Sequence, residues 1–325
     1  VLAPLQSDVW NYRRKARLGV KYVAKKEKTL IGFREKKHGQ YIIDMQQCHI
    51  LDARFQAHFQ ALQTMLNQMP AKAFIPQVEL SVGESVALVF RHLQALSLED
   101  ERLLEAFARE SGFHIYLQAK GPDSLKLLAP VDASMNMQVE LPVAGLKLTF
   151  QPLDFIQVNA SMNNLMIKQA LELLDLQAHD RVLDLFCGLG NFTLPIASKA
   201  GYVYGVEGNA LMIERAKQNA KAQGVENIDF QVADLQTLEA VEQFRGMTFN
   251  KVLLDPARDG AEVAVIALAK MGIKHMVYVS CHPATLARDA QILRTQFGYK
   301  MAHGGVMDMF PHTNHIESMA VFIKE

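Results

Sequence analysis

The spacing of apolar residues changes once along the chain, and each pattern predicts a different architecture. From about residue 12 to 150, short apolar segments separated by charged residues or glycine predict strands that pair antiparallel. Apolar residues at helical spacing over 55–69 predict one helix, and Ser97 three residues before Asp100 predicts the capped start of another. The strands predicted here are 19–23, 30–34, 41–45, 86–90, 114–117 and 146–150. The pattern indicates an antiparallel sheet flanked by helices.

Beyond about residue 155, apolar runs alternate with amphipathic stretches of helix length. Near-continuous apolar strands joined by helices are typical of a mainly parallel sheet covered on both faces. The predicted strands are 182–186, 203–206, 229–232, 251–254 and 276–279, with helices over 211–223 and 284–297. We therefore predict an α+β domain over residues 1–153 and a doubly wound α/β domain over residues 154–325.

Composition narrows the class of protein. Half of the 325 residues are apolar and 8% are aromatic, which is enough to build cores and excludes general disorder. The apolar runs are shorter than the roughly 18–20 residues of a membrane span, and the N-terminus lacks a signal-peptide pattern. Three cysteines are too few for a disulfide framework. We expect a monomeric cytoplasmic protein without membrane contact, and a first residue of Val1 rather than Met indicates a fragment of a longer chain.

The net charge of zero, from 34 basic and 34 acidic residues, hides an asymmetry. Residues 1–49 contain 11 Lys or Arg and four Asp or Glu, a net charge of +7, so the remaining residues sum to −7. A basic segment of this kind is either a solvated strand face or a surface for nucleic-acid phosphates. Charge alone does not separate these two interpretations.

A glycine loop follows the first strand of the second domain. Gly188 and Gly190 let the backbone turn tightly and approach a ligand ahead of a helix, with Asp184 at the preceding strand end. A dinucleotide fingerprint would place a third glycine where Thr193 stands, so the glycines alone are weak evidence. Glu207 ends the next strand about 20 residues later, where an acid can bind ribose hydroxyls. This combination resembles the Rossmann-like S-adenosylmethionine (SAM)-dependent methyltransferases; the alternative is a structural turn in another α/β enzyme.

The ends of the later strands indicate the chemistry. Residues 255–258, Asp-Pro-Ala-Arg, lack the aromatic ring that amine-methylating enzymes of this class usually carry, so amine methylation is disfavoured. Cys281 follows the fifth strand at the edge where α/β sheets bind ligands, and the start of the next helix is expected to favour its thiolate. A thiolate added to C6 of uracil activates C5 as a nucleophile, and a base must then remove the C5 proton. Glu317, among apolar residues at the start of the last strand, is a candidate base because partial burial raises a carboxyl pKa.

Together these motifs resemble the 5-methyluridine (uracil-C5) RNA methyltransferases, most closely the branch that modifies 23S ribosomal RNA and carries an iron–sulfur cluster. The matching stretches are 155–159, 182–195, 253–258, 278–289 and 308–318, with 12–17 and 46–48 in the first domain. The resemblance implies a Rossmann-like catalytic domain, SAM as methyl donor and 23S ribosomal RNA as partner. It also implies a covalent adduct between Cys281 and C6 of a uridine extruded from the RNA, with Glu317 as the base.

The resemblance assigns roles to further residues. Those expected to line the cofactor and target-base site are Gln157, Phe186, Gly188, Gly190, Asn191, Glu207, Asp234 and Asp255, with Asp234 near the adenine. Phe155 is the candidate to stack on the extruded uracil. The other expected substrate-binding residues are Arg258, Arg13, Arg14, Lys15 and Arg17.

The chain departs from the family pattern in three ways. His282 stands where the family usually has Asn after the nucleophile, and we expect this change to be tolerated. The branch binds a [4Fe–4S] cluster through four cysteines, of which Cys48 matches the fourth. One thiol cannot hold the cluster, so Cys48 is a ligand only in a longer chain and otherwise a plain buried cysteine. An N-terminal TRAM-type RNA-binding domain, common in the family, is also missing from this sequence.

Three other hypotheses compete with a ribosomal RNA methyltransferase. The first is a transfer-RNA 5-methyluridine methyltransferase of the same family. The second is an RNA-binding module that has lost catalysis, which the presence of both Cys281 and Glu317 disfavours. The third is a small-molecule methyltransferase, which the basic N-terminal segment disfavours.

Overall fold

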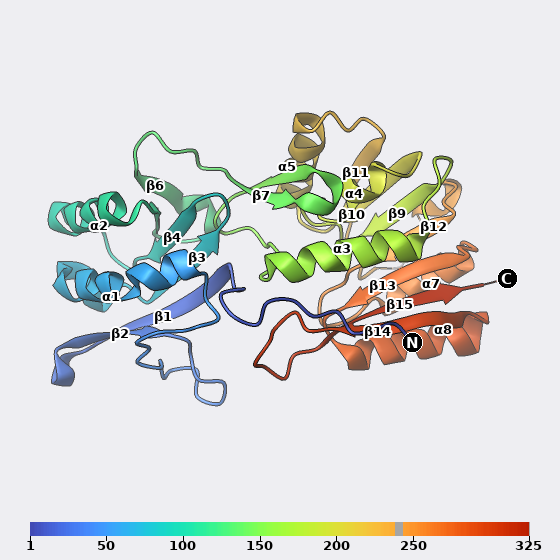
Figure 1. Cartoon of the computed structure of the whole chain (residues 1–325). Helices are drawn as coiled ribbons and strands as arrows, with labels where there is room; N and C mark the ends of the chain where they lie inside the picture. The colour runs from blue at the N-terminus through green and yellow to red at the C-terminus, as the bar shows by residue number, and fades with distance from the viewer. Residues whose placement is uncertain (238–242, 325) are drawn as a thin grey trace. The chain divides into compact units, whose positions relative to one another are not determined.

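The computed structural model describes residues 1–237 and 243–324, which form two compact units (Figure 1). Unit 1 comprises Val1–Ser7, Glu140–Thr149 and Ser161–Glu325, and unit 2 comprises Asp8–Val139 and Phe150–Ala160. The assignment of RNA binding to residues 1–153 and of catalysis to residues 154–325 stays a prediction. Across the described ranges, no helix combines the length and hydropathy needed to cross a membrane.

Unit 2 is built on a mixed sheet with the strand order β2-β1-β3-β4-β5-β6. Its strands are β1 (Lys15–Val23), β2 (Lys28–Gly32), β3 (Gln77–Val82), β4 (Val86–Arg91), β5 (His114–Gln118) and β6 (Leu125–Ala129). β4 and β5 are parallel because α2 (Leu98–Ser111) crosses between them, whereas the other neighbours are antiparallel. α1 (Ala53–Gln68) and α2 bury their apolar faces in the same core as the sheet.

The structure corrects the sheet predicted for this region in three places. Segment 41–45 is not a regular strand: beside β2 it forms an isolated bridge between Ile42 and Arg34, with backbone hydrogen bonds from Ile43 to the Phe33 carbonyl and from Met45 to the Ile31 carbonyl. The β4–β5 pair is parallel rather than antiparallel. The predicted strand 146–150 is β8 (Leu146–Phe150), which pairs with β7 (Met137–Leu141) in a separate two-stranded ribbon.

The start of α2 confirms the capping prediction. The Ser97 hydroxyl accepts a hydrogen bond from the Asp100 backbone N–H at 3.2 Å, and the Asp100 carboxylate accepts one from the Ser97 backbone N–H at 2.9 Å. The helix ends at Gly112, whose φ of 73° lies in the left-handed region that glycine adopts without strain. Local sequence signals therefore fix both ends of this helix.

Unit 1 contains a larger sheet with the order β11-β10-β9-β12-β13-β15-β14. The first five strands in this order are parallel, and β15 runs antiparallel between β13 and β14. The bounds are β9 (Arg181–Leu185), β10 (Tyr202–Glu207), β11 (Ile228–Val232), β12 (Lys251–Leu254), β13 (His275–Ser280), β14 (Lys300–Met307) and β15 (Glu317–Ile323). The predicted mainly parallel, doubly wound sheet is confirmed.

Helices cover both faces of this sheet. Val252, Leu253 and Leu254 are consecutive and fully buried, which requires packing on each side of the strand. α7 and α8 share one core with β9, β10, β12 and β13. The helices are α3 (Ala160–Leu174), α4 (Thr193–Ala197), α5 (Ala210–Ala222), α7 (Glu262–Lys270) and α8 (Pro283–Phe297). Short 3-10 turns lie at Ala24–Lys26, Pro70–Phe74, Pro122–Ser124, Pro142–Ala144 and Gln243–Gly246.

The strand order reverses between β9 and β12. The chain proceeds outward from β9 through β10 and β11 on one side, and from β12 to β13 on the other. In open α/β sheets, ligands bind outside the carboxyl ends of the strands at such a switch point. The loops after β9 and β12 are therefore where a site is expected.

Candidate active site

The loop after β9 has the backbone geometry of a ligand cradle. Phe186, Gly188 and Gly190 adopt φ angles of 65°, 55° and 92°. A left-handed φ is uncommon for phenylalanine and is typical of functional loops. The backbone N–H of Gly188 donates to Oε2 of Glu207 at 3.3 Å, which ties the loop to the end of β10.

Asp184 lies fully buried at the end of β9, beneath this loop. Its Oδ2 accepts a hydrogen bond from the hydroxyl of Thr193 at 2.6 Å, while Oδ1 has no hydrogen-bond partner among the described residues. Burial, reinforced by the charges of Asp255 and Glu207, raises the pKa of Asp184 to about 7. Thr193, which breaks the dinucleotide fingerprint, thus has a structural purpose that the sequence did not reveal.

The other residues predicted for the cofactor lie along the same edge of unit 1, with one exception. Asn191 exchanges two amide hydrogen bonds of 2.9 Å with Asn163 of α3. Asp234 is exposed after β11 and accepts from the Gln236 backbone N–H at 3.0 Å. The exception is Gln157, which belongs to unit 2.

Strand register brings Cys281 and Glu317 together. Ser280, the last residue of β13, pairs with Ser318 of β15 in the antiparallel register. The pairing with β13 ends there; Cys281 directly follows β13, and Glu317 is the first residue of β15. A thiol and a carboxyl group from distant parts of the sequence therefore lie at the same sheet edge, where the charge of Glu317 acts on the thiol.

The surroundings of Cys281 raise the pKa of its thiol. Burial, followed by the charges of Glu317 and Asp255, raises the pKa of Cys281, while Arg258 acts in the opposite direction. The expected favouring of the thiolate by the start of α8 does not decide the direction of the shift, because loss of water and two nearby carboxylates oppose ionisation. The thiol therefore needs a proton acceptor or the charge of Arg258 to ionise.

Two carboxyl groups near the thiol are shifted toward neutral pH. Glu317 is 6% exposed, and burial together with Asp255 raises its pKa to about 8, in the direction that the sequence predicted. Loss of solvation likewise raises the pKa of Asp255, which follows β12, to about 7. Titratable groups with shifted pKa values at a sheet edge mark a candidate site of proton transfer.

Unit 2 holds the remaining predicted site residues. The guanidinium of Arg14 is buried and donates through Nε to the carbonyl of Gln157 at 2.7 Å. The ammonium of Lys15 donates to the carbonyls of Pro152 and Asp154. Burial lowers the pKa of Arg14 to about 10 and that of Lys15 to about 8. These cations hold the segment 152–157 by its backbone.

Three further predicted substrate-binding residues of unit 2 differ from Arg14 and Lys15 in burial or partner. Phe155, within that segment, is 63% exposed. Arg17 is exposed and forms an ion pair of 3.0 Å with Glu79. Arg13 is partly buried and loses solvation, which lowers its pKa. Their predicted contacts with substrate stay predictions.

Cys48 is a free, half-buried cysteine packed against the core of unit 2. Its backbone N–H donates to Oε1 of Gln56 at 2.8 Å. Over the described part of the chain, no three or more His, Cys, Asp or Glu side chains group so that they could hold a metal ion. The residues present do not fit an iron–sulfur cluster, and Cys48 as a fourth ligand stays a prediction for a longer chain.

The Rossmann-like sheet, with its glycine loop and acids at the carboxyl edge, is the fold of the SAM-dependent methyltransferases. Similar solved structures include the Pyrococcus abyssi tRNA (uracil-54, C5)-methyltransferase in complex with S-adenosyl-L-homocysteine, with a TM-score of 0.77 and 22% identity over 98% of this chain and 78% of that one. The M. jannaschii tRNA m1G37 methyltransferase gives a TM-score of 0.50 and 13% identity over 76% and 74%. These likenesses support the fold.

A family model described as tRNA (uracil-5-)-methyltransferase matches residues 4–325, and the chain belongs to this family. Similar proteins include the 23S rRNA (uracil(1939)-C(5))-methyltransferase RlmD of Vesicomyosocius okutanii subsp. Calyptogena okutanii (strain HA), 46% identical over 99% of this chain and 73% of that protein. The protein of the same name from Legionella pneumophila (strain Lens) is 45% identical over 100% and 73%. The predicted family and enzyme class, a SAM-dependent RNA (uracil-C5) methyltransferase, are confirmed.

Proposed function

We propose that this enzyme transfers a methyl group from SAM to C5 of the uridine in 23S ribosomal RNA that its relatives modify, uracil 1939. Two observations support the proposal. Relatives of that name are 44–46% identical over essentially the whole chain. Cys281 and Glu317, at the adjoining ends of β13 and β15, are a thiol and a carboxyl group of the kinds that C5 methylation of uracil requires as nucleophile and base.

We assign the chemical steps as follows. The thiolate of Cys281 adds to C6 of the uracil, which places an enolate electron pair on C5. SAM supplies the electrophilic methyl group, and C5 forms the new bond to carbon as the methyl–sulfur bond breaks. The carboxylate of Glu317 then takes the C5 proton, and the electrons of that C–H bond re-form the C5–C6 double bond as the Cys281 thiolate leaves. Its raised pKa makes Glu317 a stronger base than an ordinary carboxylate.

The residues around the glycine loop fit the cofactor. Asp184 carries a buried carboxylate oxygen without a partner among the described residues. Gly188 and Gly190 adopt left-handed backbone angles and, as glycines, place no side chain between the loop and a ligand. Glu207 is partly exposed at the end of β10, where a carboxylate can accept from ribose hydroxyls. We propose that these residues hold SAM together with Phe186, Asn191, Asp234 and Asp255. Gln157, which belongs to unit 2, stays a cofactor residue by the family resemblance alone.

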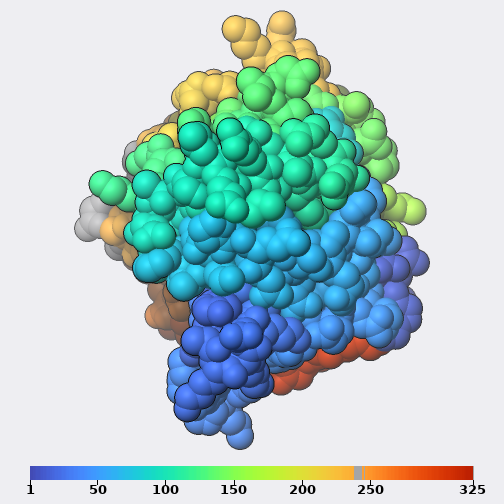
Figure 2. Space-filling view, turned by 90° about the vertical axis from the view of Figure 1, so that its left-hand side faces the viewer, coloured from blue at the N-terminus to red at the C-terminus, as the bar shows by residue number. Residues whose placement is uncertain are grey.

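We propose that unit 2 contacts the RNA through two sets of residues. Arg14 and Lys15 position the segment that carries Phe155, which would stack on the extruded base. Arg13, Arg17 and, from unit 1, Arg258 would contact the substrate. The phosphates would lie on the β1–β2 hairpin and the loop after β2, which project at the lower edge of unit 2 in Figure 2. The exposed lysines there are Lys21, Lys25, Lys26, Lys36 and Lys37.

The RNA target is tested by methylation in vitro with labelled SAM. The protein is incubated separately with a 23S ribosomal RNA transcript and with transfer RNA, and the product is mapped by nuclease digestion. We expect 5-methyluridine in the ribosomal RNA at the position that corresponds to uracil 1939. Methylation of transfer RNA alone would overturn the ribosomal assignment and support the transfer-RNA enzyme.

The hairpin contact makes a prediction of its own. The double variant Lys25→Gln/Lys26→Gln is expected to weaken RNA binding several-fold and to reduce the slope of log K against log salt by about 1–2, because each lost phosphate contact removes a slope of roughly 0.7–0.9. Filter binding at several salt concentrations measures both quantities. The matched control is Lys120→Gln/Lys126→Gln, which removes the same charge near β6 at the opposite edge of the sheet. Equal losses in the two variants would contradict a specific contact.

A cytoplasmic location, a monomeric state and an iron–sulfur cluster in a longer chain stay predictions from the sequence. Iron and sulfide analysis of anaerobically prepared protein tests the cluster.

A further inference from the structure

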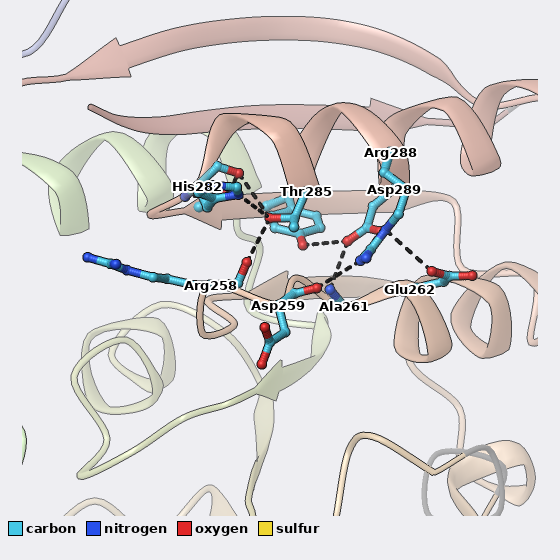
Figure 3. A network of polar contacts seen from close by, with 10 residues as sticks. Arg258, Asp259, Ala261, Glu262, His282, Thr285, Arg288 and Asp289 are labelled. Atoms are coloured by element: carbon cyan, nitrogen blue, oxygen red, sulfur yellow. Dashed lines mark hydrogen bonds and ion pairs between the residues drawn. The ribbon is translucent and has the colours of Figure 1, made fainter. Parts of the chain in front are cut away.

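Asp289, a residue to which the proposed chemistry gives no role, is the centre of a buried polar network (Figure 3). It lies on α8 and is fully buried. Its Oδ2 accepts hydrogen bonds from the Ala261 backbone N–H at 2.8 Å and from the Tyr278 hydroxyl at 2.7 Å. Its Oδ1 accepts from the guanidinium of Arg288 at 2.8 Å. The carboxylate thus joins three elements: the loop after β12, strand β13 and helix α8.

The loop held by this carboxylate has little freedom to move. Gly260 has a φ of 77°, and a Cβ built there would lie 2.9 Å from Oδ2 of Asp289 and 2.7 Å from Nη2 of Arg288. Arg288 also donates through Nη2 to the carbonyl of Asp259 at 2.9 Å. Only glycine fits a left-handed position pressed this closely against another element. The loop is therefore fixed against α8 by its backbone.

Thr285 extends the same network to the start of α8. Its hydroxyl lies 3.2 Å from the carbonyl of Arg258 and 3.0 Å from the carbonyl of His282, so it can donate to either. The side chain of Arg258 points away from the network in Figure 3, while its backbone is held. His282 directly follows Cys281. The carbonyls of the residue after the thiol and of the residue that carries the nearby positive charge thus both lie within hydrogen-bond distance of one hydroxyl.

We infer that Asp289 is a positioning residue that, through the loop after β12 and with Thr285, fixes Asp255 and Arg258 relative to Cys281. This inference rests on the proposed covalent mechanism. Asp255 and Arg258 belong to the loop whose end the carboxylate holds, and β13, which ends beside Cys281, is held through Tyr278. The charged groups that act on the thiol are Glu317 and Asp255, which oppose its ionisation, and Arg258, which favours it. Release of the loop would leave Glu317 in place, because Glu317 belongs to β15.

The test measures formation of the covalent adduct with RNA that contains 5-fluorouridine, where the C5 fluorine stops the reaction after methyl transfer. We expect Asp289→Asn to form the adduct 10- to 100-fold more slowly than the parent, the size of effect that small misplacements of reacting groups produce. The pH at which the adduct rate is half-maximal should rise, because Arg258 is no longer held near the thiol. The dissociation constant for SAM should rise by much less than the adduct rate falls, because Asp255 alone of the proposed cofactor residues belongs to the released loop and the glycine loop is untouched.

Two milder variants keep the inference testable if Asp289→Asn does not fold. Tyr278→Phe removes one donor to the carboxylate, and Thr285→Val removes the hydroxyl that faces Arg258 and His282. Both should slow adduct formation and raise its pH midpoint, by less than Asp289→Asn. Gln291→Ala, at an exposed position of α8, is the control for disturbance of the helix and should match the parent.

The outcomes separate the inference from the mechanism beneath it. A parent enzyme that forms no adduct would overturn the covalent mechanism and, with it, the inference. A parent that forms the adduct, with folded variants that react at the parental rate and pH midpoint, would overturn the positioning role alone. A loss of SAM binding equal to the loss of adduct rate would also overturn it, since that would indicate general damage to unit 1.

Discussion

Replacement of Cys281 by alanine is expected to abolish methyl transfer, with a loss of at least about 10³-fold in single-turnover rate. C5 of uracil is a poor nucleophile until a thiolate adds to C6, and Cys281, directly after β13 and near Glu317, is the candidate to supply it. The measurement is transfer of a labelled methyl group from SAM to RNA at saturating enzyme. The same variant should form no adduct with 5-fluorouridine RNA that survives a denaturing gel.

Cys187→Ala is the matched control for removal of a thiol. Cys187 is 4% exposed, and burial raises its pKa well above the usual value, so it is an inert apolar side chain within unit 1. This variant should keep the adduct and most of the methylation rate. Residual methylation by Cys281→Ala at more than a tenth of the parental rate would exclude the covalent mechanism.

Replacement of Glu317 by glutamine is expected to stop turnover after methyl transfer. Without a base the C5 proton stays in place and the thiolate cannot leave, so a methylated RNA–enzyme adduct should accumulate while turnover falls about 10²–10⁴-fold. Denaturing gels with labelled SAM detect the adduct directly. For the parent, the rate should rise as pH increases through about 8, because only the ionised Glu317 accepts the proton.

The substitution Glu317→Gln, which lowers turnover, should increase the free energy of unfolding as pH rises. The pKa of Glu317 is about 8 in the folded protein, above the 4.5 that an exposed glutamate has. Between these values the folded state binds more protons than the unfolded state, so the stabilising contribution is complete below about pH 4.5 and is lost as pH rises toward 8. Glutamine cannot ionise. Urea unfolding should therefore show that the free energy of unfolding of Glu317→Gln rises relative to that of the parent by ~1–3 kcal/mol as the pH is raised from 5 to 8.

An exposed acid provides the control for both measurements. Glu226 lies in the exposed turn before β11, and Glu226→Gln should leave turnover and the pH dependence of stability unchanged. If Glu317→Gln turned over at the parental rate, another group would have to take the C5 proton. Asp255, with a pKa of about 7, would then be the next residue to replace.

Several elements of the fold and of the site follow from local sequence alone. The capping box at Ser97 and the apolar strand β12 depend on neighbours within a few residues, so the sequence predicts them without knowledge of the rest of the chain. The acids and the cysteine at strand ends are predictable for the same reason. In a parallel sheet all carboxyl ends lie at one edge, and placement on strands is therefore enough to gather Asp184, Asp255 and Cys281.

Tertiary structure decided what depends on contacts between distant segments. The pairing of β15 with β13 brings Glu317 to the sheet edge that carries Cys281, and burial raises the pKa of the thiol although the nearby helix start was expected to favour the thiolate. Arg14 and Lys15 are cations in a basic segment by sequence, yet the structure directs them to backbone carbonyls of residues 152–157. Sequence determines the kind of residue at each strand end because that choice is local. The partner and the degree of burial of each side chain depend on segments that only the folded chain brings into contact.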